Sequence, residues 1–246
     1  MPTERAVSSV LGYVLIFAIV LLSITATFTL GLGALTDARD GSVQENSRRS
    51  MQSLSTTIEA VRETNTTVRD IRLRTGPGTV ESGDQTRLTV SIDGSQTLQT
   101  TFRPIRYRYE DQQIVYEAGG LLQTTGDSGV LLERPPFVFE DDTVLVTPTT
   151  TTPIQRGSTN ARTVTTVIRR ATVRQATLLT GSHTVDVTIE TQPRRAAIWE
   201  RTLLEMLPPS GTCSRTGATV NCEFTPSDSD ATILVREFRV SYAFSS

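Results

Sequence analysis

The fold of this chain is decided first by the stretch Val10-Leu-Gly-Tyr-Val-Leu-Ile-Phe-Ala-Ile-Val-Leu-Leu-Ser-Ile-Thr-Ala-Thr-Phe-Thr-Leu30, which lies in a run without charged residues from Ala6 to Thr36. An apolar run longer than about 18 residues can cross a bilayer, and in lipid a helix satisfies its own backbone hydrogen bonds. A secretory signal peptide has a shorter apolar region of about 7–15 residues. Gly31, Gly33 and Ala34 resemble a cleavage site and keep that alternative open. We predict a transmembrane helix over residues 7–36.

The flanks of this span favour one orientation in the membrane. Arg5 and the α-amino group precede the span, whereas Asp37, Arg39 and Asp40 follow it. Positive charge tends to stay on the cytoplasmic side. We therefore expect a single-pass protein of the cell membrane, with the N-terminus inside and residues 37–246 outside the cell.

An amphipathic helix is predicted over residues 37–70, as the second part of one long N-terminal helix. Met51, Leu54, Ile58, Val61 and Val68 are spaced 3, 4, 3 and 7 residues apart and form one apolar face. This face packs on the protein's own head, or it serves as a stalk that contacts neighbouring subunits. We expect a bend or break in the long helix at its glycines Gly31, Gly33 and Gly41.

A β-rich head is predicted over residues 71–246. About ten short strands with period-2 alternation are separated by Gly-containing turns, which is typical of a sandwich or a barrel-like sheet. They lie near Ile71, Leu88–Ile92, Ile105–Tyr109, Ile114–Tyr116, Val130–Leu132, Val138–Phe139, Val144–Val146, Val164–Val173, His183–Ile189 and Ile233–Phe244. One accessory helix, Arg194–Leu207, ends at Pro208-Pro209, and Trp199 is expected to anchor it. The predicted fold class is α+β. The run Thr147–Pro153 is interpreted as a linker, a glycosylated stalk or an exposed loop.

Composition excludes several functions. The 24 basic residues, all Arg, nearly balance 26 acidic ones, so the basic footprint of a nucleic-acid binder is missing. One His and two Cys nearly exclude His-rich and Cys-rich metal sites, zinc sites in particular. His183 is interpreted as a surface residue, and the carboxylates Asp84, Glu110, Asp111 and Glu140–Asp142 as solvated loop residues without the spacing of a calcium loop. We predict no enzyme activity, no cofactor and no metal site.

Two covalent features are predicted for an extracellular head. Cys213 and Cys222 flank a polar, Gly-containing insert typical of a hairpin, so a disulfide is expected. Closing so short a loop stabilises a protein by about 2–3 kcal/mol in the chain-entropy view. Asn65 begins the Asn-Thr-Thr sequon and is a candidate for N-glycosylation.

The N-terminus resembles that of archaeal type IV pilins. The resemblance rests on Arg5-Ala-Val-Ser-Ser-Val-Leu-Gly12 and the apolar run after it. It implies a short leader, residues 1–6, which a prepilin-type peptidase removes between Ala6 and Val7. The freed helix then serves as a membrane anchor and later as the packed core of a filament. Ser9 stands where many of those pilins have Pro, and Tyr13 interrupts the apolar stretch.

A second resemblance extends through the chain. Leu35–Asp40, Ile114–Gly120 and Pro193–Glu200 look like an uncharacterised family of haloarchaeal pilin-like membrane proteins, which brings no biochemical activity with it. We therefore predict a membrane-anchored, exported pilin-like subunit of a surface filament or pilus-related assembly. The alternative is a single-pass anchored protein whose head binds a ligand or an envelope component without assembling. The small residues expected to permit close helix packing with other pilin-like subunits are Gly12, Ala18, Ser23 and Ala26.

Overall fold

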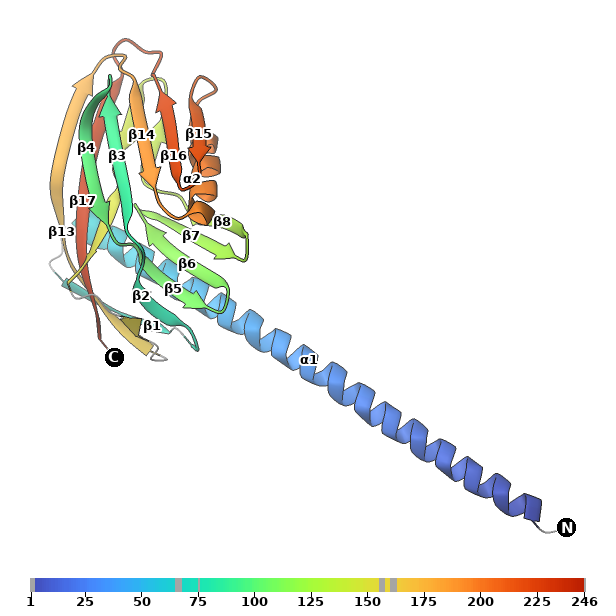
Figure 1. Cartoon of the computed structure of the whole chain (residues 1–246). Coiled ribbons are helices and arrows are strands. Elements are labelled where there is room, and N and C mark those ends of the chain that lie inside the picture. Colours follow the sequence, from blue (N-terminus) through green and yellow to red (C-terminus); the bar gives the residue numbers. More distant parts are fainter. Residues whose placement is uncertain (1–2, 65–67, 75, 155–157, 160–162, 246) are drawn as a thin grey trace. The chain divides into compact units, whose positions relative to one another are not determined.

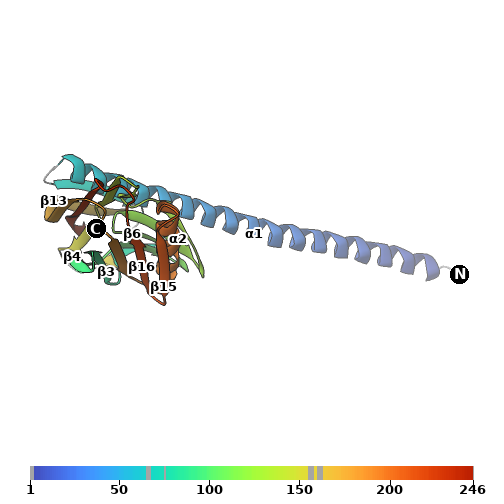
Figure 2. The ribbon, with the colours of Figure 1, turned by 90° about the horizontal axis from the view of Figure 1, so that it is seen from above.

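The computed structural model describes residues 3–64, 68–74, 76–154, 158–159 and 163–245. The chain divides into two compact units, Met1–Glu45 and Asn46–Ser246. The first is helical, and the second combines strands with two helical segments (Figures 1 and 2). The α+β fold class predicted from the sequence is confirmed.

The N-terminal helix α1 spans Thr3–Thr64, a length of 62 residues. Its backbone is helical through Gly31, Gly33 and Gly41, so the expected break at the glycines is wrong. A glycine inside a helix costs only about 1 kcal/mol, which the neighbouring helix formers offset. The helix ends before residue 70. Val68, which the sequence placed on the helical face, belongs instead to strand β1 (Val68–Arg74).

The part of α1 that belongs to the second unit packs on the β-rich domain. Met51, Leu54, Ile58 and Val61 are at most 1 % exposed and join one hydrophobic core with side chains of two sheets. Of the two interpretations of this apolar face, packing on the protein's own head is the one that the structure has.

Three sheets are formed by the strands within the described residues. In sheet A the order is β1, β13 (Thr163–Thr180), β17 (Thr232–Ser245), β10 (Thr143–Val146) and β9 (Phe137–Phe139). The strand β17 pairs antiparallel with β13 along one edge. Its other edge pairs in parallel with β10 and then with β11 (Thr149–Pro153). The long strands β13 and β17 therefore lie in the middle of sheet A.

The strand pairs of the other two sheets are all antiparallel. Sheet B has the order β12 (Ser158–Thr159), β2 (Thr79–Ser82), β5 (Ile105–Tyr109), β6 (Gln112–Glu117), β7 (Gly120–Thr125) and β8 (Ser128–Glu133). Sheet C has the order β15 (Thr212–Thr216), β16 (Thr219–Phe224), β14 (Val185–Glu190), β3 (Thr86–Ile92) and β4 (Ser95–Phe102). All ten predicted strand regions fall in or overlap these strands.

The accessory helix α2 (Pro193–Met206) lies alongside β15 and β16 (Figures 1 and 2). Pro193 starts it, because proline fits the first turn, and Pro208 follows its end. A second hydrophobic core fills the space between sheet C, α2 and the part of sheet A around Ile233 and Val235 of β17. Trp199 is 0 % exposed there and stacks on Phe137, as the anchor expected from the sequence.

The Thr/Pro run is where the interpretation of the sequence is wrong. Residues 149–153 form strand β11, and Thr149, Thr150 and Thr151 are buried. Threonine is a good strand former, and its hydroxyl can be buried where it finds a hydrogen-bond partner. The run is therefore neither a linker nor an exposed loop.

Candidate functional sites

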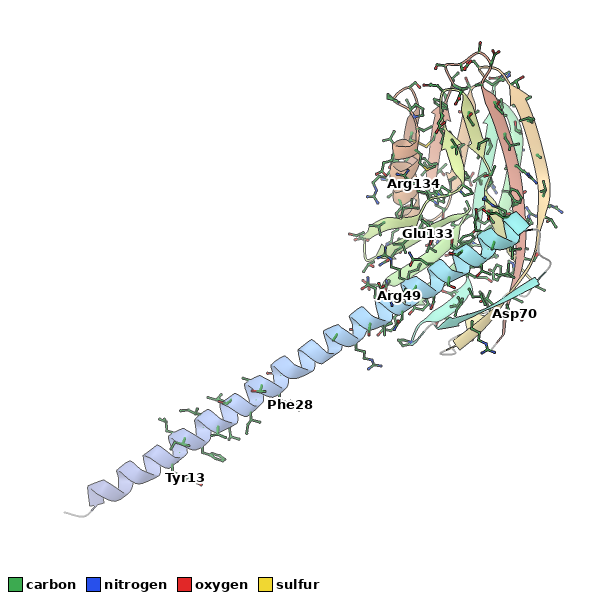
Figure 3. All side chains as sticks on the ribbon, turned by 180° about the vertical axis from the view of Figure 1, so that it is seen from behind. Tyr13, Phe28, Arg49, Asp70, Glu133 and Arg134 are labelled. Atoms are coloured by element: carbon green, nitrogen blue, oxygen red, sulfur yellow. A yellow bond between two sulfur atoms is a disulfide. The ribbon has the colours of Figure 1, made fainter. Side chains whose placement is uncertain are left out.

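The apolar segment of α1 is built for a medium other than water. Gly12–Thr29 is the one segment among the described residues that is long and apolar enough to cross a membrane, with a mean hydropathy of 2.1. None of it is buried, and its large apolar side chains, such as Tyr13 and Phe28, stand out around the helix (Figure 3). A bilayer or a set of neighbouring helices can cover such a surface, whereas water cannot do so without a cost in free energy.

The hydroxyl groups of this segment form hydrogen bonds within the helix itself. Ser23, Thr25 and Thr27 donate hydrogen bonds of 2.8–2.9 Å to the carbonyl oxygens of Ile19, Leu21 and Ser23, four residues earlier. Thr29 donates in the same way to Thr25. Bonds of this kind satisfy a polar side chain without a partner outside the helix, as lipid requires.

The structure says little about the predicted leader and modification sites. Arg5, Ala6 and Val7 lie on the helical backbone of α1, but their side chains lie outside the described residues, as does Asn65. Gly12, Ala18, Ser23 and Ala26 are all exposed. At about 100° per residue, Gly12, Ser23 and Ala26 share one face, and Ala18 lies on an adjacent one.

A buried polar cluster joins two of the sequence motifs named above. Glu117 at the end of β6 is 0 % exposed, and Arg195 on α2 is 2 % exposed. The carboxylate oxygen Oε2 of Glu117 accepts a hydrogen bond of 3.1 Å from Trp199 Nε1 and forms an ion pair with Arg195 Nε at 3.1 Å. Arg195 Nε donates its hydrogen bond to Thr191 Oγ1 at 2.9 Å. The other carboxylate oxygen of Glu117 accepts from the hydroxyls of Thr86 and Thr191. One carboxylate thus connects α2 with sheets B and C.

The turn after Glu117 is shaped for this contact. Ala118 and Gly119 have φ angles of +54° and +93° and form the two-residue connection from β6 to β7. Such mirror-image turns match the twist of the strands. A Cβ atom at Gly119 would lie 2.5 Å from Pro136 Cδ, and one at Gly120 would lie 3.3 Å from Trp199. The Ala-Gly-Gly sequence therefore lets the hairpin approach its neighbours closely. The structure gives this cluster a structural role, since no described group in it is open to a substrate.

A second buried carboxylate was missed by the sequence analysis. Glu237 on β17 is 3 % exposed and accepts hydrogen bonds from Thr100 at 2.8 Å and Thr150 at 2.6 Å. Arg239 forms an ion pair with it at 2.9 Å. The available signal was alternation, because Glu237 has the same parity as the core residues Ile233 and Val235.

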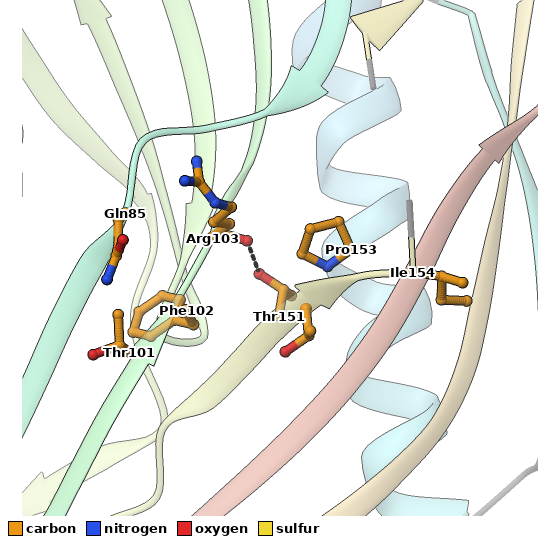
Figure 4. Close-up of a pocket in the computed structure, with 8 residues that line it drawn as sticks. Gln85, Thr101, Phe102, Arg103, Thr151, Pro153 and Ile154 are labelled. Atoms are coloured by element: carbon orange, nitrogen blue, oxygen red, sulfur yellow. Dashed lines mark hydrogen bonds between the residues drawn. The ribbon is translucent and has the colours of Figure 1, made fainter. Parts of the chain in front are cut away.

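An open groove of about 390 Å³ lies where β4 and β11 end. It is lined by Gln85, Thr101–Arg103 and Thr151–Ile154 (Figure 4). Thr151 Oγ1 donates to the carbonyl oxygen of Arg103 at 2.7 Å, and Arg103 Nη1 donates to the carbonyl oxygen of Gly83. Among the described residues that line the groove, no nucleophile is paired with a base.

The predicted disulfide is present. Cys213 and Cys222 are direct neighbours on β15 and β16, with their Cα atoms 4.1 Å apart. The turn of this hairpin uses Gly217 at a φ of +61°. Arg215 also forms an ion pair with Glu200 of α2 at 2.8 Å. Disulfides persist in oxidising compartments, and this one agrees with a head outside the cytoplasm.

The remaining polar candidates form no cluster suited to metal binding. No group of three or more His, Cys, Asp and Glu residues gathers anywhere in the described part of the chain. His183 precedes β14, and its Nδ1 lies 2.6 Å from Asp93 Oδ2. This hydrogen bond is the main cause of the lowered pKa of Asp93. Burial raises the pKa of the Tyr242 hydroxyl to about 12, against the effect of its hydrogen bond to Ser82.

Comparison with known proteins places the chain in a family. A model described as a family of unknown function (DUF7289) matches residues 5–241. The chain belongs to this family. The match covers both the apolar segment and the β-rich domain. No curated protein and no solved structure matches the chain.

Proposed function

We propose that this protein is a type IV pilin-like subunit that is exported, held in the membrane by α1 and contributed to a surface filament or a pilus-related assembly. One observation carries the proposal. A single helix exposes an apolar surface on all sides over Gly12–Thr29 and supplies buried core residues to a β-rich domain over Met51–Val61. Such a helix couples a folded head to a segment that lipid or other helices must cover.

The function in this proposal is assembly and not catalysis. The proposed partners are the membrane, a prepilin-type peptidase and further pilin-like subunits, with no role for nucleic acid. The peptidase would cut between Ala6 and Val7, and the freed helix would exchange lipid for neighbouring helices. The hydroxyls of Ser23, Thr25 and Thr27 bond to the backbone of α1 and need no partner outside the helix, so they suit both lipid and neighbouring helices.

Mass spectrometry of the mature N-terminus from native membranes tests the proposal. A chain that starts at Val7 only when the prepilin-type peptidase is present supports it. A start at Met1 or Pro2 both with and without the peptidase overturns it in favour of a permanent anchor whose head binds a ligand. A start after Ala34 overturns it as well, because the apolar segment would then be a secretory signal.

A pair of matched variants sharpens this experiment. Each places a carboxylate beside one of the two candidate cleavage points. Ala6→Glu is expected to reduce the Val7 start strongly, whereas Ala34→Glu is expected to leave it unchanged. The opposite pattern, with only Ala34→Glu blocking maturation, contradicts processing before the apolar segment.

A further inference from the structure

One face of sheet A is covered over only part of its length. Along β17, Ile233 and Val235 point into the core shared with sheet C, so the residues between them point to the opposite face. On that opposite face, Val240 and Tyr242 are buried under the second half of α1. The helix ends at Thr64, and Arg62 near its end lies over the ring of Phe238 at 5.4 Å. Past the end of α1, no described helix lies over this face of the long strands β13 and β17 (Figure 3).

An aliphatic row crosses the bare part of this face. Strand pairing places Leu178 beside Leu234, Leu234 beside Leu145, and Leu145 beside Val138. The row thus runs across β13, β17, β10 and β9. Leu178 is 67 % exposed, and the other three are partly exposed. The outer face of sheet C carries polar residues at comparable positions, including Thr89, Ser91, Asp186, Thr188 and Asn221. The aliphatic row is therefore a local feature of sheet A.

Charges of opposite sign lie on the two sides of this row. On one side are two loops that hydrogen-bond to each other, through Asp228 N to Asp141 O and Thr232 N to Asp142 O. These loops carry five exposed carboxylates, none of which forms an ion pair with a described residue: Glu140, Asp141, Asp142, Asp228 and Asp230. On the other side, Arg236 lies over the Phe238 ring at 4.5 Å and has no ion-pair partner in the described part of the chain.

We propose that the bare half of this face binds the same half of a second copy of this chain, around a two-fold axis that runs along the aliphatic row. Each row residue then packs on its own symmetry mate. The rotation also reverses the strand direction, which places the acidic loops of one copy over Arg236 of the other. At about 3.3 Å per residue, Arg236 lies about 7 Å from the row and Asp142 about 10 Å, so the two positions correspond.

This charge pattern selects a second copy over other occupants. An isologous contact requires a surface that is complementary to itself, and a row flanked by acid on one side and base on the other meets that requirement. The contact goes beyond the proposed function, because an isologous contact closes a pair of chains and does not by itself extend a filament.

Cysteine cross-linking of the full chain in membranes tests the contact. The native cysteines are bonded to each other, so an introduced cysteine is the only free thiol among the described residues. Leu178→Cys is expected to give a disulfide-linked dimer on mild oxidation. Leu204→Cys is the matched control, because Leu204 is 52 % exposed but lies on α2, away from the row. Equal dimer yields for the two variants, or none for Leu178→Cys, overturn the proposal.

Charge reversal supplies a second test, which uses the yield of the same Leu178→Cys cross-link to measure the effect of the flanking charges. Arg236→Glu in the Leu178→Cys background is expected to lower the dimer yield about tenfold or more, since it places like charges together. Adding Asp142→Arg is expected to restore the yield, because the isologous contact then has its charges exchanged. Failure of the double variant to restore the dimer, with Trp199 fluorescence unchanged, overturns the two-fold arrangement.

The two proposals fail in distinguishable ways. A Leu178→Cys dimer together with an unprocessed N-terminus supports the contact and overturns the pilin-like assignment. A peptidase-dependent Val7 start without this dimer supports the pilin-like subunit and overturns the contact.

Discussion

The apolar segment of α1 and the β-rich domain place polar and apolar groups in opposite ways. The segment Gly12–Thr29 exposes its leucines, isoleucines and valines and bonds its hydroxyls to its own backbone. The domain hides its apolar side chains and also encloses the carboxylates of Glu117 and Glu237. The difference teaches that a charge is tolerated in this protein only where the surroundings compensate it, by ion pairs in the core and by water on the surface.

The largest loss of folding stability is expected at Glu117, the buried carboxylate whose charge is compensated by an ion pair and by hydrogen bonds. Glu117→Gln should destabilise the domain by about 3–5 kcal/mol, the range for breaking a buried ion pair. An amide offers one acceptor oxygen where three side chains donate, and Arg195 would keep its charge without a counter-ion. Urea unfolding of the detergent-solubilised chain, followed by fluorescence of its single tryptophan, Trp199, measures the loss.

Glu190→Gln is the control for this measurement. Glu190 pairs with Arg87 at 3.1 Å, but both side chains are nearly half exposed. Solvent screens such a pair, so the change should stay within about 1 kcal/mol. Similar losses for the two variants would contradict the compensating role assigned to the Glu117 cluster.

A charge in the apolar segment should have the next largest effect, on location and not on folding. Val20→Arg puts a guanidinium at the centre of the segment, where membrane insertion becomes less favourable by about 2.5–3.5 kcal/mol. The fraction of the chain that floats with membranes should fall, while Trp199 fluorescence stays native. Ser53→Arg, on an exposed position of the second half of α1, should change neither. Unchanged flotation of Val20→Arg would argue against a membrane role of the segment.

Elements with strong local signals were predictable from the sequence. The alternation of Thr86–Ile92 appears as alternating burial in β3, and the hairpin of β5 and β6 lies where two alternating runs meet. The accessory helix begins and ends within one residue of its predicted limits, because prolines bound it. These signals arise from residues a few positions apart, so one sequence contains them.

Elements that depend on distant partners were not predictable. The strand β11 consists of threonines and a proline, and its burial depends on Glu237, 87 positions away from Thr150. Its parallel pairing with β17 leaves no local trace either. In the same way, the sequence predicts a strand within Ile114–Gly120 and a helix within Pro193–Glu200, but no contact between the two segments. Their meeting at Glu117, Arg195 and Trp199 became visible with the fold.

The smallest effect is expected for a charge on the wet face of sheet C. Asp186 and Glu223 are direct neighbours on β14 and β16. Partial burial, and then repulsion by Glu223, raise the pKa of Asp186. A carboxyl whose pKa is higher in the folded state binds its proton more tightly there. Stability is therefore lost as pH rises through the window between the ordinary and the raised pKa, and it stays lower above that window.

Replacing Asp186 by a neutral residue measures how much its charge lowers the folding stability of the domain. Asp186→Asn should stabilise the domain at neutral pH by a few tenths of a kcal/mol, up to about 1 kcal/mol for like charges directly opposite. The gain should vanish below the ordinary pKa of an aspartate, where the parent carboxyl is protonated in both states. Thermal unfolding of parent and variant across pH 3–7 measures it. A gain that persists at the acidic end would mean that the asparagine acts through packing or hydrogen bonding. The charge of Asp186 would then not destabilise the folded domain, because water on this face already screens it.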